Sequence, residues 1–226
     1  MLPNRCRTSR DDVGFGPSML GAVLGLIGIA AAILVPLGIE RFKRPVLGID
    51  RSDDLNYTPP GMPPRRMVHI RVRNEPITGW PARLLLRNVA TGCRVSVRFT
   101  SRSDGVSLHI DGRWSAAPEP LRWETAAGGT VFAAELVPSG FRLDVQPGAD
   151  EVVAVALKDD GDASAFAFGQ WSYRVPDLKL KPWWELPHDE YDVEVVARAG
   201  GIEARRSFVL HNAGTTAGGL KLTTSD

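Results

Sequence analysis

The side chains that most often carry catalysis or hold metal ions are scattered along this chain of 226 residues. Its four histidines, His69, His109, His188 and His211, lack the i,i+4 or short-hairpin spacing that a metal site favours. Cys93 has no histidine close to it in sequence that would activate a thiolate nucleophile. Walker, Rossmann and G-x-S-x-G motifs are absent from the sequence. We therefore predict a protein that is not an enzyme and that holds no metal and no cofactor.

Asp159, Asp160 and Asp162 are the carboxylates whose spacing comes nearest to a cation site. Carboxylate oxygens are ligands that calcium prefers, but this stretch lacks the EF-hand pattern of alternating ligands closed by a glutamate. Aspartate followed by glycine is also common in tight turns, because glycine accepts the backbone angles that the turn needs. We therefore predict a turn here.

Trp183 and Trp184, which lie between Pro182 and Pro187, are the most conspicuous apolar pair. Exposed tryptophans can anchor a protein partner, stack on a sugar ring or lie at a bilayer interface. Alternatively, the pair closes one end of the folded domain beneath the loop that leads to Tyr191, and we favour this second interpretation. Ordinary core positions are predicted for the other tryptophans, Trp80, Trp114, Trp123 and Trp171.

Composition excludes several classes of protein. Hydrophobic residues make up 43% of the chain and charged residues 23%, which indicates a folded domain rather than a disordered chain. A net charge of +1 supplies none of the general phosphate attraction on which nucleic-acid binders depend, so we predict no nucleic-acid partner. The two cysteines are too few for a disulfide framework or a zinc site made of cysteines.

Charge is unevenly distributed along the chain. Residues 65–113 contain ten arginines and three acidic residues, whereas residues 114–226 contain ten basic and seventeen acidic residues. If strands from the two parts pair, opposite charges meet across the strands on the wet faces of the sheets. A basic face kept apart would instead indicate an acidic partner or lipid headgroups.

Near the amino terminus, residues 13–39 carry no charged side chain, and residues 19–35 are apolar enough to cross a bilayer as a helix. About 20 apolar residues span the hydrocarbon layer. A cleaved secretory signal is the alternative, but its apolar stretch is only about 7–15 residues long and ends at an A-x-A-like site. This run is longer and continues into Pro36 without that site. We predict a retained transmembrane helix over residues 18–39, preceded by a tail over residues 1–17, and a lipid bilayer as partner.

Basic residues on the two sides of this span decide the expected topology. Four lie close behind it, against three in front, which weakly favours a cytoplasmic location for the large carboxyl-terminal part over an extracytoplasmic one. The four are Arg41, Lys43, Arg44 and Arg51, and the three are Arg5, Arg7 and Arg10.

Small residues recur at spacings of three and four within the span. Gly21, Gly25, Gly28 and Ala32 fall on one stripe of a helix, and Gly21 with Gly25 forms a G-x-x-x-G pattern. This pattern lets two helices approach closely and indicates a homodimer through the membrane helix. The alternative, which we favour, is that glycine and alanine are simply common in membrane helices.

Beyond the span, residues 40–64 are predicted to be a basic juxtamembrane segment and a proline-rich linker, in which residues 46–49 form a short strand. From residue 65 onward, apolar residues alternate with polar ones, which is typical of strands with one buried face. The clearest alternating runs are 68–72, 95–99, 141–145 and 191–197, and residues 151–158 are more continuously apolar, as in a central strand. Shorter strands are predicted at 83–89, 106–110, 130–136 and 165–174.

The end of this region predicts a hairpin, with residues 191–198 and 202–210 joined at Gly200 and Gly201. Tyr191 stands just after a loop and two residues before the inward position Val193. This arrangement resembles the tyrosine corner of immunoglobulin-like domains, and the resemblance covers residues 66–212. It implies that the Tyr191 hydroxyl bonds to upstream backbone and that Val193 stands where antibody domains place their second cysteine.

We therefore predict a mainly β protein: an antiparallel immunoglobulin-like β-sandwich over residues 65–212, behind one amino-terminal transmembrane helix and before a flexible tail over residues 213–226. The expected function is membrane-anchored protein–protein interaction. Two alternatives stay open. One is a membrane-tethered carbohydrate-binding module that uses Trp183 and Trp184, and the other is an enzyme with an unrecognised site.

Overall fold

A computed structural model describes residues 17–58, 61–116, 122–124, 130–132, 142–172, 182–187 and 189–225. It divides into two compact units, one that ends at Lys43 and one that begins at Arg44. The first unit contains helix α1 (Pro17–Lys43), which includes the expected span and continues to the basic residues Arg41 and Lys43. Residues 21–37 of this helix expose their side chains and are all apolar, so this stretch has no polar face. The stretch Gly21–Lys43 is long and apolar enough to cross a membrane.

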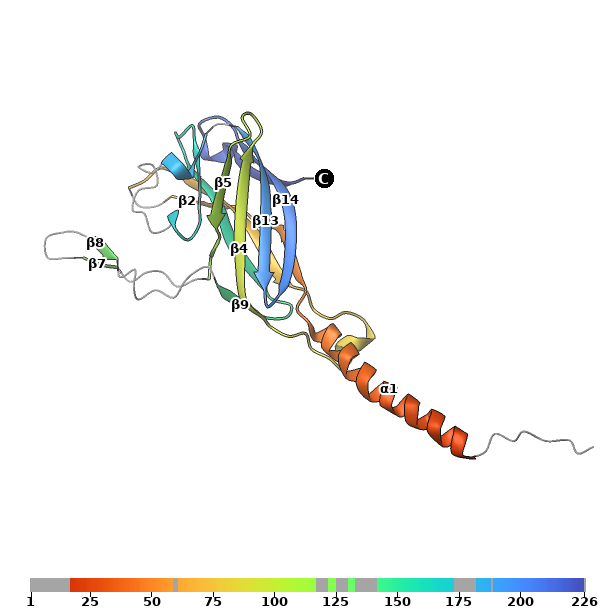
Figure 1. Cartoon of the computed structure of the whole chain (residues 1–226). Helices are drawn as coiled ribbons and strands as arrows, with labels where there is room; N and C mark the ends of the chain where they lie inside the picture. The colour runs from red at the N-terminus through yellow and green to blue at the C-terminus, as the bar shows by residue number, and fades with distance from the viewer. Residues whose placement is uncertain are drawn as a thin grey trace, which may run out of the picture. The chain divides into compact units, whose positions relative to one another are not determined.

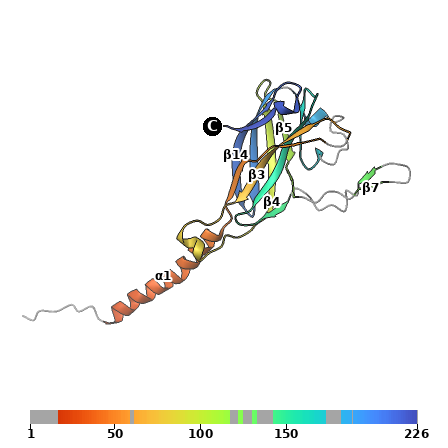
Figure 2. The same cartoon turned by 180° about the vertical axis from the view of Figure 1, so that it is seen from behind.

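The second unit, called the β domain below, consists of two antiparallel sheets that pack face to face (Figure 1 and Figure 2). In the first sheet the strands run in the order β1-β3-β10-β11-β12, and β2 and β6 pair with β3 and β10. Its strands are β1 (Leu47–Arg51), β2 (Leu55–Tyr57), β3 (Arg65–Asn74), β6 (Arg113–Trp114), β10 (Asp150–Asp159), β11 (Ala165–Ala167) and β12 (Glu185–Leu186).

The second sheet has the order β15-β14-β13-β4-β5, and β9 pairs with β4. Its strands are β4 (Ala90–Ser101), β5 (Ser107–Asp111), β9 (Leu143–Val145), β13 (Glu190–Ala199), β14 (Ile202–Asn212) and β15 (Leu220–Thr224). Strands β7 (Arg122–Glu124) and β8 (Thr130–Phe132) form a separate ribbon. Short 3-10 helices are η1 (Trp80–Arg83), η5 (Pro182–Trp184) and η6 (Ala217–Gly219).

Period-two alternation places the core where the sequence predicts it. In β3, β4 and β13, every second side chain is buried between the sheets, and each large apolar group removed from water stabilises the fold by about 1.5–3 kcal/mol. The continuously apolar segment 151–158 forms most of β10, which lies between β3 and β11 and is therefore a central strand, as predicted. The β domain is thus a mainly β fold whose two-sheet packing is compatible with a β-sandwich.

The predicted hairpin is confirmed, because β13 and β14 pair along their whole length and Ala199 lies opposite Ile202. The two residues between them are Gly200 and Gly201, with φ of 51° and 81°. Two successive positive φ angles match the right-handed twist of the flanking strands, and glycine adopts them without a steric penalty.

Opposite charges meet across the strands, as the uneven charge distribution predicts. Within the first sheet, Arg65 lies opposite Asp159 and Arg73 opposite Asp150, and both pairs form ion pairs with N–O distances of 2.5 Å. Each pair joins the arginine-rich part of the chain to the acidic part. The second sheet repeats the arrangement at Arg98 and Glu194, which are opposite each other at 2.6 Å.

Four segments differ from the sequence prediction. The strand predicted at 165–174 ends at Ala167 as β11, and residues 168–172 are not a strand. Residues 83–89 are not a strand, because the amides of Leu84 and Leu85 bond to the carbonyl of Pro81 and curl the chain into η1 and a loop. In the predicted linker 40–64 the short strand expected at residues 46–49 is present as β1, but the linker also contains β2, which the sequence does not predict; both strands pair with β3. The predicted tail 213–226 contains β15, whose Leu220 and Leu222 are fully buried against the core.

Candidate functional site

One end of the β domain, called the far end, contains a cavity of about 270 Å³ under the loop that precedes β13. The turn between β4 and β5 covers one side of this cavity, and the segment between β12 and β13 covers the other. Its lining combines apolar groups with three carboxylates: Phe99, Ser101, Ser103, Asp104, Val106, Leu108, Glu185, Leu186, Pro187, Asp189 and Tyr191. We call it the Tyr191 pocket.

Tyr191 is buried at the wall of this pocket, and its hydroxyl donates to the carbonyl oxygen of Pro187 at 3.1 Å. This is the bond to upstream backbone that the tyrosine-corner resemblance implies. Burial, together with repulsion from the Asp189 carboxylate, raises the pKa of Tyr191 to about 12. The phenol therefore stays protonated and pins the loop rather than exchanging protons.

Asp189 joins the loop to the β4–β5 turn. Its Oδ2 accepts hydrogen bonds from the hydroxyls of Ser101 at 2.6 Å and Ser103 at 2.7 Å, and from the Ser103 amide at 3.2 Å. These bonds from Ser101 and Ser103 hold the pKa of the Asp189 carboxyl well below its usual range. The carboxylate is thus ionised at neutral pH, which makes it unsuited to general acid–base work there.

Lys158 is fully buried near the end of β10. Its ammonium donates to Asn212 Oδ1 at 2.6 Å, to the carbonyl of Gly214 at 2.7 Å and to the carbonyl of Ala163 at 3.4 Å. Burial lowers the pKa of Lys158, because the charged amine has lost most of its water. Three oxygen acceptors compensate for that loss, so the lysine fixes the surrounding loops in place.

The Asn212 side chain carries this network to the Tyr191 loop. Its amide nitrogen donates to the carbonyls of Leu186 at 2.9 Å and Pro187 at 3.0 Å. The Pro187 carbonyl therefore accepts from both Tyr191 and Asn212. Sequence reasoning missed Lys158 and Asn212. The only local signal is a lysine at the end of an apolar strand, and the contact joins residues 54 positions apart.

Trp183 and Trp184 lie in η5, which directly precedes the pocket residue Glu185 in the chain. Trp184 is half-buried and packs against the core, whereas Trp183 exposes 58% of its surface. The ring centroids are 5.9 Å apart and the planes meet at 67°, an edge-to-face arrangement rather than a flat platform. The sequence prediction that both close the end of the domain therefore describes Trp184 but not Trp183.

Of the other tryptophans, Trp114 is buried as predicted. Trp80 and Trp171 are exposed at 75% and 51%, so the prediction that they belong to the core is wrong for both. Trp80 lies in η1 at the turn between the sheets, and Trp171 follows β11, where its indole nitrogen donates to Asp111 Oδ2 of β5 at 3.3 Å. The side chain of Trp123 lies outside the described residues.

Among the described residues, the histidines and Cys93 do not come together in one site. His69 is on the first sheet, where burial lowers its pKa, and His109 and His211 are on the second. His188 falls outside the part of the chain that the structure describes. Cys93 is buried, which raises the pKa of its thiol to about 12 and leaves it unreactive. Among the described residues, no group of three histidines, cysteines or carboxylates is placed to hold a metal.

The aspartates after β10 form the predicted turn, with Gly161 at a φ of 93°. Asp159 pairs with Arg65, and Asp160 Oδ1 accepts from the amide of Ala217 at 3.0 Å.

In α1 the stripe of Gly21, Gly25, Gly28 and Ala32 is exposed, and an added Cβ at any of these glycines would meet open space. Dimerisation through the stripe stays a prediction.

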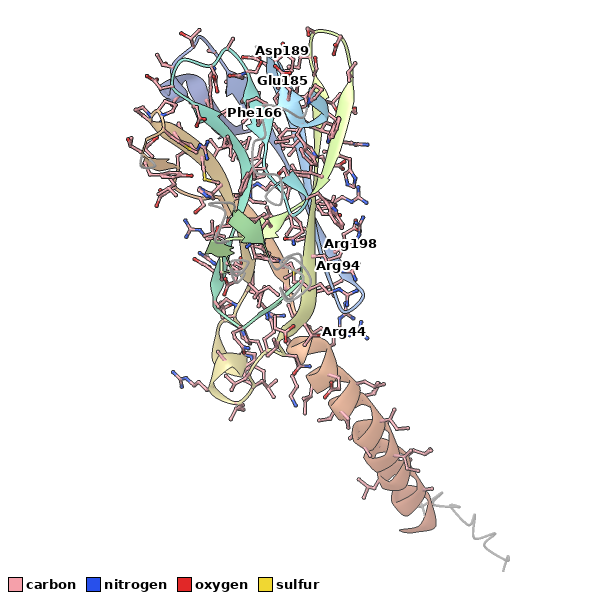
Figure 3. The ribbon with its side chains drawn as sticks, turned by 90° about the vertical axis from the view of Figure 1, so that its left-hand side faces the viewer. Arg44, Arg94, Phe166, Glu185, Asp189 and Arg198 are labelled. Carbon is pink, nitrogen blue, oxygen red and sulfur yellow. The ribbon has the colours of Figure 1, made fainter. Side chains whose placement is uncertain are left out.

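The opposite end of the domain, called the tethered end because the chain enters it at Arg44, is basic and irregular. It comprises residues 44–47, the crossing segment 75–89 and the turn of the β13–β14 hairpin. Figure 3 shows Arg94 and Arg198 toward this end and Glu185 and Asp189 at the far end. Arg94 and Arg198 lie opposite each other on β4 and β13, at the rim of an open hollow of about 430 Å³.

Comparison of the chain with family models, with curated proteins and with solved structures finds no match.

Proposed function

We propose that this chain is a single-pass membrane protein that uses an immunoglobulin-like domain to bind another protein and performs no catalysis. The anchor rests on α1, whose large apolar side chains are exposed on every side. Exposing them to water would be costly, whereas a bilayer accommodates them and leaves the helical backbone bonds intact. The span is 23 residues from Gly21 to Lys43, which is enough to cross the hydrocarbon layer.

The immunoglobulin-like assignment is supported by the two packed antiparallel sheets together with the bond from Tyr191 to Pro187. In such domains a tyrosine at the start of the penultimate long strand fixes the crossing loop in the same way. Loops at the end of a rigid sandwich are also common binding surfaces, because the sheets hold them without restricting their sequence.

The observation that carries the binding proposal is Trp183, an exposed tryptophan that precedes Glu185, a residue of the acid-lined Tyr191 pocket, by two positions in the chain. Tryptophan is enriched among the residues that contribute most to protein interfaces. Asp104, Glu185 and Asp189 give the rim a negative charge, which favours a partner that presents lysine or arginine. Trp184 is half-buried and meets Trp183 edge to face, so the two rings form no flat platform for a sugar, which supports a protein partner over a carbohydrate.

We place the domain on the cytoplasmic side, in accordance with the basic residues that follow the span. A fluorescent protein fused after Asp226 is expected to mature, and alkaline phosphatase fused at the same point is expected to be inactive. The reverse pattern would assign the domain to the other side and change the class of partner. Labelling Cys93 would be a poor substitute, because the buried thiol would be silent on either side.

Photo-cross-linking tests the binding surface directly. A photoreactive amino acid at position 183 of the membrane-embedded protein is expected to form a discrete protein adduct in cells. Trp171 is the matched control position, because it is also a tryptophan and is exposed to a similar extent, 51% against 58%. Adduct formation that is equal at the two positions, or absent at position 183, would contradict the proposed surface.

A further inference from the structure

The crossing segment 75–89, which leads from the first sheet to the second, exposes the most apolar surface of the β domain. Leu86 is 81% exposed, Leu84 77% and Trp80 75%, more than any other large apolar side chain among the described residues. Three such groups fall in one short loop, and their exposure to water is unfavourable. We call it the Trp80 loop.

Hydrogen bonds hold both ends of this loop against the residues that directly follow α1. At its start, the amide of Glu75 donates to the carbonyl of Val46 at 2.8 Å. At its end, Arg87 Nη1 donates to the carbonyl of Arg44 at 2.5 Å. Arg44 directly follows Lys43, the last residue of α1, in the chain. If α1 spans a bilayer, chain connectivity alone keeps the base of the Trp80 loop close to the membrane surface.

Cationic side chains accompany the apolar ones. Arg83 ends η1 and Arg87 closes the loop, and Arg87 donates to the carbonyl of Arg44, which follows the basic residues Arg41 and Lys43 in the chain. Basic residues near a bilayer are attracted to anionic headgroups, and tryptophan and leucine partition into the interfacial layer. The loop therefore combines the two kinds of side chain that favour a lipid surface.

We propose that the Trp80 loop is a second membrane contact, which inserts Trp80, Leu84 and Leu86 into the headgroup layer beside the transmembrane helix. This inference rests on the proposed anchor. Contact at two points would restrict the pivoting of the β domain about the short connection at Arg44 and present the far end in a defined direction.

Fluorescence quenching tests the proposal on the full-length protein in vesicles of phosphatidylcholine and phosphatidylglycerol that carry brominated acyl chains. Subtracting the signal of Trp80→Phe from that of the wild-type protein isolates Trp80. We expect the lipid-quenched part of the emission to disappear in Trp80→Phe and to persist in Trp171→Phe and Trp183→Phe. Equal quenching in Trp80→Phe and in the wild-type protein would overturn the proposal.

A second variant separates lipid insertion from the mere removal of a fluorophore. Leu84→Ser with Leu86→Ser keeps Trp80 but removes its apolar neighbours, so quenching is expected to fall toward the level of Trp80→Phe. Quenching unchanged from the wild-type level would show that the leucines do not insert. Failure of the anchor is recognised separately, because the protein would then not float with the vesicles at all.

Discussion

The far end and the tethered end of the β domain differ in which side chains are held by hydrogen bonds and which are exposed. At the far end, polar side chains are hydrogen-bonded and connect separate loops: Lys158, Asn212 and Tyr191 are buried, and Asp189 is partly exposed. At the tethered end, hydrogen bonds tie the base of the Trp80 loop to Arg44 and Val46, while its large apolar side chains are exposed. Buried and satisfied polar networks fix one geometry, as recognition requires, whereas exposed apolar groups need an external apolar phase.

This comparison predicts that Asn212→Ala is the most damaging of the changes considered below. The substitution leaves the buried Lys158 ammonium short of an acceptor and the Leu186 carbonyl without its side-chain donor. We expect a loss of about 3 kcal/mol in the free energy of unfolding, measured by denaturant unfolding of the full-length protein in detergent. Asn56→Ala, on the exposed strand β2, is the control and is expected to change little.

Lys158→Met sharpens the same prediction. It removes the buried charge together with its need for acceptors and fills a similar volume, so it should cost less, about 1–2 kcal/mol. A loss of under 1 kcal/mol in Asn212→Ala would show that the network does not hold the far end.

A smaller effect is expected for Tyr191→Phe. The Pro187 carbonyl keeps its bond from Asn212, so the loss of one hydroxyl bond should reduce stability by about 1 kcal/mol. Combining Tyr191→Phe with Asn212→Ala deprives that carbonyl of both donors, and the double variant should lose more than the sum of the two single changes. Strict additivity in the double-mutant cycle would mean that the two side chains act independently.

Low pH should destabilise the far end, because it protonates the Asp189 carboxylate. Because hydrogen bonds lower its pKa in the folded state, the folded protein binds the proton less readily than the unfolded chain does. The stabilisation is complete above the ordinary pKa of an aspartate and is lost as the pH falls toward the folded-state pKa. The melting temperature of the wild-type protein should therefore fall more steeply between about pH 5 and pH 3 than that of Asp189→Asn. Parallel curves would contradict a stabilising role for Asp189.

The contrast between the ends also shows what the sequence can predict. Alternation in β3, β4 and β13 is local, so these strands and their buried faces could be predicted. Strand β15 could not be predicted, because the alternating pattern of Leu220 and Leu222 covers too few residues and their burial depends on pairing with β14. The same holds for Lys158 and Asn212, whose contact depends on the packing of the two sheets. Trp80 was misassigned because tryptophan is usually buried, and only the path of the crossing segment exposes it.

The smallest effect on stability is expected at the tethered end. Replacing Trp80, Leu84 and Leu86 together by serine removes side chains that are already exposed in the fold, so the free energy of unfolding in detergent should change by no more than about 0.5 kcal/mol. Denaturant unfolding measures this under the conditions used for Asn212→Ala. A loss approaching that of Asn212→Ala would mean that the loop packs on the β domain, and the distinction between the two ends would then fail. If the free energy of unfolding is unchanged and the lipid quenching is weaker, these side chains act by inserting into the bilayer rather than by stabilising the fold.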